Sequence, residues 1–240
     1  MDKASEHYQK ALTILIFLAF TIHSMSQVGI GTTSPAASAQ LDVSSTTKGF
    51  LPPRMTGAQR DAISKPEFGL VIYNATSDNL QVYKKGTESL NINQSLWNMT
   101  NPAPAGVYQS FIATASGVLG SVDLVMQNPS STFNSTVYVR IYAGAGISGT
   151  LLATSQIVTP TNGYDWNKFT FLGPGYATLT SGQTYTILLT PIGSFDRYTW
   201  IGIASDVYAN GQAGFPGSGF YQPYDLPFKT YLLAPSWVNL

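Results

Sequence analysis

The sequence contains no cysteine, and its only two histidines, His7 and His23, stand close to the N-terminus. A Ser-His-Asp relay and a Cys-His pair each need one of these two residue types, and structural zinc sites are built mainly from them. If the first 26 residues are removed, as argued below, the mature chain has neither. The sequence therefore predicts a protein that is not an enzyme and that has no cofactor and no metal site.

Charged residues are scarce as well, at 10% of the chain, and 12 basic side chains balance 12 acidic ones. Nucleic-acid binding depends on neutralising many phosphates, so a neutral chain gives no reason to expect that partner. No glutamate follows Glu88, and no D-x-D-x-D cluster appears. The five later aspartates are therefore interpreted as turn residues rather than as catalytic carboxylates or calcium ligands.

The N-terminal segment has the order typical of a secretory signal peptide. Lys3 and Lys10 precede the largely apolar run 11–22, and the small residues Ser24 and Ser26 follow it. Crossing a bilayer takes roughly 20 apolar residues, so we favour cleavage after Ser26, with a membrane anchor as the alternative. Cleavage would remove two basic and two acidic residues, leave 10 of each, and leave no segment able to span a membrane. The protein is expected to be secreted or held at the cell surface.

A change in composition near residue 100 indicates two parts. Residues 27–100 hold six basic and five acidic residues, whereas the longer stretch from 101 onward holds only four and five. The same point is marked by the segment 101–106 (NPAPAG), whose prolines favour an extended connection. We predict an N-terminal element over 27–100, a linker over 101–106 and a second domain over 107–240.

The N-terminal element shows signals for one short helix and one β-hairpin. Thr56 and Gln59 form a capping-box pattern for a helix that ends before Pro66. The β-rich runs 69–74 (GLVIYN) and 80–83 (LQVY) flank turn-forming residues. A hairpin and a short helix make a thin core, so this element is expected to dock on another surface or to form a homo-oligomer.

These residues also carry a resemblance. The run VGIGTTSPAASAQLDVSSTTKGFLPPRMTGAQRDAI, followed by the two hairpin strands and Trp97, resembles an N-terminal element of exported bacterial surface proteins and tail-fibre-like chains. The segment GFLPPRMT is its most specific part. In such proteins the element precedes varied C-terminal modules and is not itself an enzyme, which implies a presenting or assembly role. The insert 84–95 is longer than the usual connection to the tryptophan and departs from the pattern.

From residue 107 onward, strand-like segments follow one another with turn residues about every ten positions. No stretch has helical periodicity. We therefore predict an all-β fold, an antiparallel jelly-roll-like β-sandwich preceded by the small hairpin-plus-short-helix element. The residues expected to face its core alternate along their strands: Val122, Leu124 and Met126; Val137, Val139 and Ile141; Phe169 and Phe171; Tyr185, Ile187 and Leu189; Ile201 and Ile203.

This second part is similar to the jelly-roll-like sandwiches of secreted bacterial proteins. The similarity is carried by QSFIATASGVLGSVDL, VYVRIYAGAGISGTLLAT, LTSGQTYTILL and YDLPFKTYL, over most of residues 109–232. These motifs are structural, because they consist of glycine turns and strand patterns. The resemblance implies a shape related to carbohydrate-binding modules, and it does not identify a ligand.

Aromatic residues on the faces opposite the aliphatic ones form the candidate binding site. Such rings can stack on the apolar C–H face of a sugar while nearby carboxylates bind its hydroxyls. A second candidate is the glycine- and aromatic-rich loop 206–225, which is longer than most connections. In the alternative, the rings cover a sheet or loop and the long loop caps the core. The predicted carbohydrate-binding residues are Trp166, Trp200, Tyr198, Tyr142, Tyr208, Asp165 and Asp196.

Two functions compete on these grounds. The first is a secreted or surface-attached, non-catalytic binding module, adhesin-like, whose partner is a glycan or surface polysaccharide. The second is a structural or assembly protein of a surface or fibre-like homo-oligomer, with residues 27–100 as its base. An enzyme ranks third, because every catalytic role would fall to Asp, Lys, Tyr or Ser alone.

Overall fold

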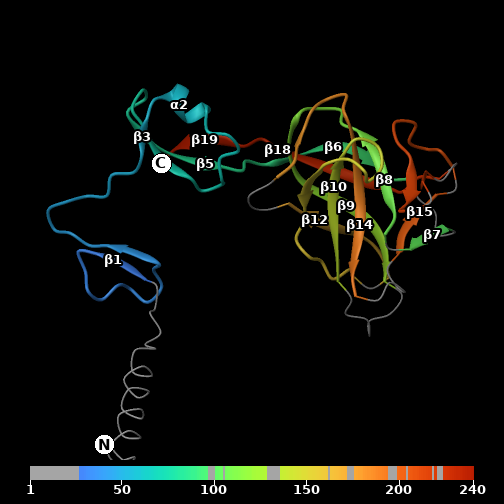
Figure 1. The fold of residues 1–240 in the computed structure, drawn as a ribbon, viewed down its shortest axis with the longest axis horizontal. Helices are drawn as coiled ribbons and strands as arrows, with labels where there is room; N and C mark the ends of the chain where they lie inside the picture. Colours follow the sequence, from blue (N-terminus) through green and yellow to red (C-terminus); the bar gives the residue numbers. More distant parts are fainter. Residues whose placement is uncertain are drawn as a thin grey trace, which may run out of the picture. The chain divides into compact units, whose positions relative to one another are not determined.

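The computed structural model describes residues 27–96, 101–104, 106–128, 136–161, 163–171, 176–193, 199–203, 205–217, 219–220 and 224–240 (Figure 1). The predicted signal peptide over 1–26 and Trp97 lie outside these residues. The described chain is almost entirely β-structure, which confirms the predicted all-β class. It divides into two compact units, one ending at Leu51 and one from Pro52 to Leu240.

The first unit holds a two-stranded parallel sheet. Strand β1 (Val28–Ile30) pairs with β2 (Leu41–Val43), with Val28 opposite Leu41 and Ile30 opposite Val43. The connection over residues 31–40 is held to β2 by the Asp42 carboxylate, which accepts a hydrogen bond from the Ala36 backbone N–H at 2.9 Å. All four apolar strand residues are exposed, so this unit has no core among its described residues.

The second unit begins with a small sheet that carries the predicted helix and hairpin. The helix α2 (Gly57–Asp61) starts at a complete capping box, in which Thr56 and Gln59 exchange hydrogen bonds. Strands β4 (Val71–Asn74) and β5 (Asn79–Lys84) form the predicted antiparallel hairpin. The short β3 (Arg54–Met55) adds in parallel to β4, and β19 (Ser236–Asn239) adds antiparallel to β5.

The remaining strands form two sheets that pack into a β-sandwich. One sheet has the order β11-β10-β14-β8-β16-β17, and the other has the order β6-β18-β9-β15-β7 with β12 and β13 also paired to β9. The strands are β6 (Glu88–Gln94), β7 (Asn101–Pro104), β8 (Tyr108–Ile112), β9 (Gly117–Asn128), β10 (Thr136–Ala143), β11 (Leu151–Thr154), β12 (Gly163–Thr170), β13 (Thr178–Leu179), β14 (Thr184–Ile192), β15 (Thr199–Gly202), β16 (Ala213–Phe215), β17 (Gly219–Phe220) and β18 (Phe228–Leu233).

One hydrophobic core joins both sheets of the sandwich. The alternating residues predicted to point inward on β9, β10, β12 and β14 all belong to it. Phe111 and Phe228 pack in its centre with their ring centroids 5.5 Å apart. The alternation predicted from the sequence is therefore confirmed on these four strands, and the stable part of the protein is built around it.

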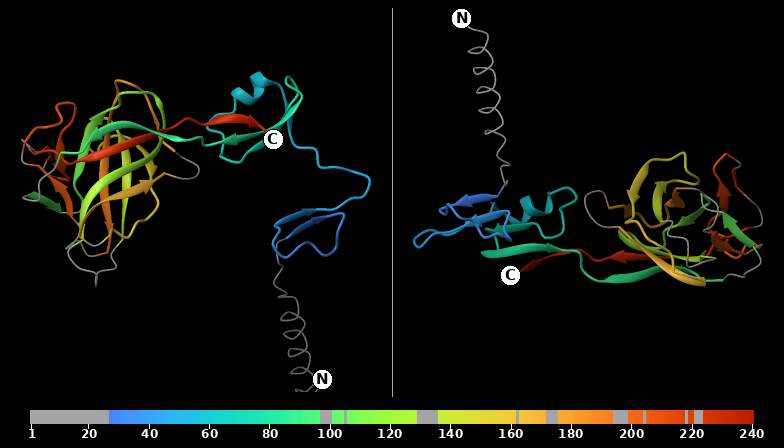
Figure 2. Two further views of the ribbon diagram at one scale, coloured as in Figure 1. Left: turned by 180° about the vertical axis from the view of Figure 1, so that it is seen from behind. Right: turned by 90° about the horizontal axis from the view of Figure 1, so that it is seen from below.

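The predicted division into 27–100, a linker over 101–106 and 107–240 is wrong. Residues 101–104 form β7, which pairs with β15 inside the sandwich. Strand β6, from the supposed N-terminal element, pairs with β18, and the C-terminal β19 pairs with β5 (Figure 2). Strand pairing joins residues that are far apart in sequence. A change in amino-acid composition along the chain therefore need not coincide with a domain boundary.

Strand β6 also explains the insert 84–95 that departs from the family pattern. Its residues lead directly from the hairpin strand β5 into the larger sheet of the sandwich. At Gly86, between the two strands, φ is +70° and an added Cβ would lie 2.1 Å from the Ala234 carbonyl oxygen. The crossing therefore requires glycine, and it fixes the connection between the small sheet and the sandwich.

Candidate ligand-binding face

The outer face of the seven-stranded sheet gathers charged and aromatic side chains. On the central strand β9, Asp123 faces outward, because its neighbours Val122 and Leu124 face the core. Lys168 of β12 lies directly opposite Asp123 on one side, and Lys229 of β18 lies opposite it on the other. Three strands distant in sequence thus place one lysine on each side of a single aspartate.

Each lysine rests on an aromatic ring of this face. Lys229 Nζ lies 4.0 Å from the centroid of the Trp166 ring, and Lys168 Nζ lies 4.8 Å from the centroid of the Tyr231 ring. A cation within about 6 Å of a ring face is attracted by the quadrupole of the ring. Trp166 is half-buried, so part of its surface remains open to solvent beside the lysine.

Asp123 has only part of its hydrogen-bonding capacity satisfied. Its Oδ2 accepts a hydrogen bond from the Tyr231 hydroxyl at 2.9 Å, whereas its buried Oδ1 has no partner among the described residues. Burial raises the pKa of Asp123, and the Tyr231 hydrogen bond and the two lysines oppose that shift. A buried, unpaired oxygen is unusual and calls for an explanation in function or in bound water.

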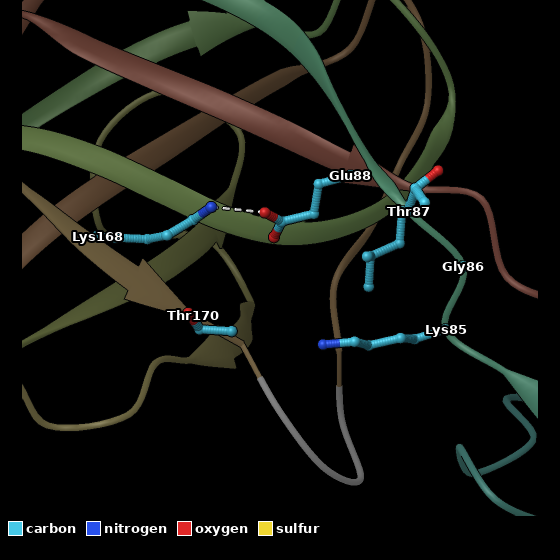
Figure 3. A pocket seen from close by; sticks show the side chains of 7 residues that line it. Lys85, Gly86, Thr87, Glu88, Lys168 and Thr170 are labelled. Carbon is cyan, nitrogen blue, oxygen red and sulfur yellow. Dashed lines mark hydrogen bonds and ion pairs between the residues drawn. The ribbon is translucent and has the colours of Figure 1, made fainter.

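A pocket of about 400 Å³ opens where this face meets the connection between β5 and β6. Lys168 Nζ pairs with Glu88 Oε2 at 2.6 Å across it. Figure 3 shows Lys85 extending into the same space from the opposite side. Thr87 and Thr170 add hydroxyl groups to the lining, and Leu233 adds an apolar wall.

Trp200, predicted to lie on an outer face, is completely buried in the core, so that prediction is corrected. Its partner across the ladder is Met126, and residues directly opposite in an antiparallel pair share a face. Because Met126 faces the core, Trp200 does too, and its Nε1–H donates to the Pro227 carbonyl at 2.8 Å. Ile201, predicted to face the core, is also fully buried, but it lies outside the core cluster. Alternation failed here because both faces of this strand are covered.

Tyr142 and Tyr208 are not brought together with Trp166. Tyr142 lies half-buried on β10, in the six-stranded sheet on the other side of the core. Tyr208 packs edge-on against the core residue Phe228, with ring centroids 5.3 Å apart. Asp165 is exposed beside Trp166 on β12, and its Oδ1 accepts a hydrogen bond from the Trp166 backbone N–H at 2.7 Å. Tyr198 and Asp196 lie outside the described residues.

The buried Asp225 anchors the long glycine- and aromatic-rich loop. Its Oδ2 accepts hydrogen bonds from the backbone N–H groups of Val207 and Tyr208 at 2.8 and 2.7 Å, and its Oδ1 accepts one from Gln109 Nε2 at 3.1 Å. The Gln109 side chain in turn accepts a hydrogen bond from the Leu226 N–H at 2.8 Å. Burial raises the pKa of Asp225, and these hydrogen bonds oppose the shift. The network favours the alternative in which the loop caps the sandwich.

Four residues of the outer face were missed from the sequence: Asp123, Lys168, Lys229 and Tyr231. Lys168 and Lys229 are two of only four basic residues after residue 101, and both alternate with core-facing positions. Alternation along β12 predicts the outward direction of Lys168, and the same signal could have placed Lys229 outside. Their meeting at Asp123 depends on the pairing of β12 and β18 with β9, which no local pattern reveals.

Across the described ranges, no three acidic, histidine or cysteine side chains are close enough together to hold a metal ion. In the same part of the chain, no helix has the length and apolar character needed to cross a membrane.

Comparison with known proteins bears on the N-terminal half. Residues 29–114 match the family described as a phage tail like trimerisation region. The match is to a structural, oligomer-forming element, and it fits the resemblance to tail-fibre-like chains seen in the same residues. No curated protein matches the chain. The alternative reading from the sequence, a structural protein of a fibre-like homo-oligomer, is thus better supported than glycan binding.

Proposed function

We propose that the protein is an exported, non-catalytic, tail-fibre-like homotrimer in which the β-sandwich is the presented module. The observation that carries this proposal is the unit over 27–51, whose four apolar strand residues are exposed on a two-stranded sheet. Two paired strands are at best marginally stable alone in water. The trimerisation family matches from residue 29, so it includes nearly all of this unit. A second and third copy would supply the surface that these side chains lack.

Light scattering on the purified protein tests the assembly. We expect a mass three times that of the chain, and we expect Ile30→Asp to reduce it to that of a monomer, because a carboxylate at an apolar interface loses its hydration. Ile157→Asp is the matched control: Ile30 is 55% exposed and Ile157 is 60% exposed. A wild-type monomer at micromolar concentration, or equal effects of the two substitutions, would refute the proposal.

Export is part of the same proposal and rests on the signal-like order of residues 1–26. Intact-mass analysis of the protein recovered from outside the cytoplasm should show a chain that begins at Gln27. A chain that keeps the apolar run 11–22 would indicate an anchored form instead.

Glycan binding by the sandwich is a second candidate function, and one observation favours it. Trp166 keeps part of its ring open on a sheet face that also carries Lys168 and Lys229. Sugars are commonly held by a ring that stacks and by polar groups beside it. Loss of binding in Trp166→Ala on a glycan array, with the fold intact, would be the expected result.

A further inference from the structure

In the unit from Pro52 to Leu240, charged side chains are concentrated around the pocket at Lys85. Beyond residue 101 the chain has only four basic residues, and Lys168 and Lys229 both lie on the outer face of the same sheet. Lys85 lines the same pocket as Lys168, where β5 crosses to β6. The face therefore collects cations on a protein that is neutral as a whole.

The charges at this pocket do not cancel. Lys168 is paired with Glu88 at 2.6 Å, whereas Lys85 has no ion-pair partner among the described residues. Both ammonium groups project into one space of about 400 Å³ (Figure 3). The lining thus has two positive groups and one negative group, together with the hydroxyls of Thr87 and Thr170. An anion placed there gains one unpaired cation and several hydrogen-bond donors.

The strand geometry extends the pocket toward the aromatic rings. Thr170, Lys168 and Trp166 occupy alternate positions of β12, so their side chains share the outer face at spacings of about 7 Å. Lys168 also lies on the Tyr231 ring. A chain of linked sugar rings that starts in the pocket can therefore run along β12 past Lys168 toward the half-buried ring of Trp166.

We propose that this surface, from the pocket at Lys85 and Lys168 to the Trp166 ring, binds an acidic carbohydrate that carries carboxylate groups. The carboxylate lies between the two ammonium groups, and the following sugar ring stacks toward Trp166. The proposal rests on the sandwich being the presented module. It requires the pocket to remain open in the assembled protein, because Lys85 falls within the region matched to the trimerisation family.

Calorimetry of the full assembled protein with hexagalacturonate tests the proposal, with the methyl-esterified form as a neutral probe of the same length. We expect binding of the acid form only. Lys85→Ala should weaken it about tenfold, the value of one charge-assisted hydrogen bond. Lys168→Ala should do the same. Lys84→Ala is the matched control, because Lys84 is an exposed neighbour that does not line the pocket.

Further probes separate the remaining outcomes. Binding of a sulfated oligosaccharide but not of hexagalacturonate would overturn the carboxylate assignment. Equal affinity for single-stranded DNA, or equal losses in Lys84→Ala and Lys85→Ala, would reduce the effect to general electrostatics and overturn the site. No binding of any acidic probe would overturn it as well. Light scattering on the same samples reports the oligomeric state independently, so a failed site and a failed trimer give different results.

Discussion

In residues 27–51, the side chains of Val28, Ile30, Leu41 and Val43 are between 41% and 55% exposed. In the sandwich, apolar residues of the same types at Val122, Val137 and similar positions are completely buried between two sheets. Both segments pair strands through regular ladders, so backbone hydrogen bonding does not distinguish them. The two segments differ in whether the chain itself supplies a second apolar layer that covers these side chains.

This contrast assigns different roles to the two units. A sandwich with its own core can fold in a single chain, because the free energy of burial is gained within that chain. A two-stranded sheet with exposed apolar residues gains the same free energy only by association. If the two units gain their free energy of folding separately, damage to the core of the sandwich leaves assembly intact.

The largest expected effect is that of Trp200→Ala. This side chain is fully buried, so its removal should cost about 3–5 kcal/mol through lost burial and a cavity. Trp166→Ala, on the outer face, is the matched control and should cost about 0.5–1 kcal/mol, the value of its cation–π contact with Lys229. Denaturant midpoints of both variants, measured beside the oligomeric mass, decide whether the core is independent of assembly. Similar losses in both would contradict the placement of these two rings.

Asp225→Ala should have the next largest effect. The substitution leaves the N–H groups of Val207 and Tyr208 without their acceptor, and Gln109 Nε2 keeps only its hydrogen bond to the Ser110 carbonyl. Leaving a buried donor unpaired costs about 1–3 kcal/mol. Hydrogen exchange should show faster exchange of the Val207 and Tyr208 amides while the β10 amides stay protected. Asp206→Ala, at an exposed residue of the same loop, is the control. Uniform loss of protection would mean that the loop and sandwich unfold together.

Sequence patterns predicted elements whose evidence is local. The helix was signalled by Thr56 and Gln59, the hairpin by its two β-rich runs, and four strands of the core by their alternation. The boundaries failed, because β6 and β19 find their partners across most of the chain. The predicted orientation of the Trp200 side chain was wrong for a related reason, because that orientation follows from its pairing with Met126 on β9.

The pairing of β19 with β5 gives the third prediction. Trp237 of β19 packs against Tyr83 with ring centroids 5.2 Å apart, and the Arg60 guanidinium lies 6.0 Å from the Trp237 ring centroid. Trp237→Ala should cost about 0.5–1.5 kcal/mol, the value of one aromatic pair. The amides of β5 should exchange faster while those of β14 do not. Tyr164→Ala, at a residue that is 41% exposed on β12, is the control. Equally faster exchange of the β14 amides would show that the small sheet and the sandwich unfold as one cooperative unit.

The smallest expected effect is a dependence of stability on alkaline pH at Tyr231. Burial raises the pKa of Tyr231 to about 12, and the hydrogen bond that its hydroxyl donates to Asp123 adds to the shift. The unfolded chain loses the phenolic proton near pH 10, so the folded state holds more protons above that pH. The contribution of Tyr231 to stability is therefore complete below pH 10 and is lost as the pH rises through about 12.

Tyr231→Phe removes this titration and keeps the ring on which Lys168 rests. Between pH 10 and 12, the unfolding free energy of the wild type should fall more steeply than that of the variant. Tyr142→Phe, which removes a hydroxyl from the outer face of the other sheet, is the matched control. Parallel curves for the wild type and Tyr231→Phe would show that this hydroxyl titrates alike in the folded and unfolded chains. The outer face of the seven-stranded sheet would then be a hydrated layer, in contrast to the buried core of the same sandwich.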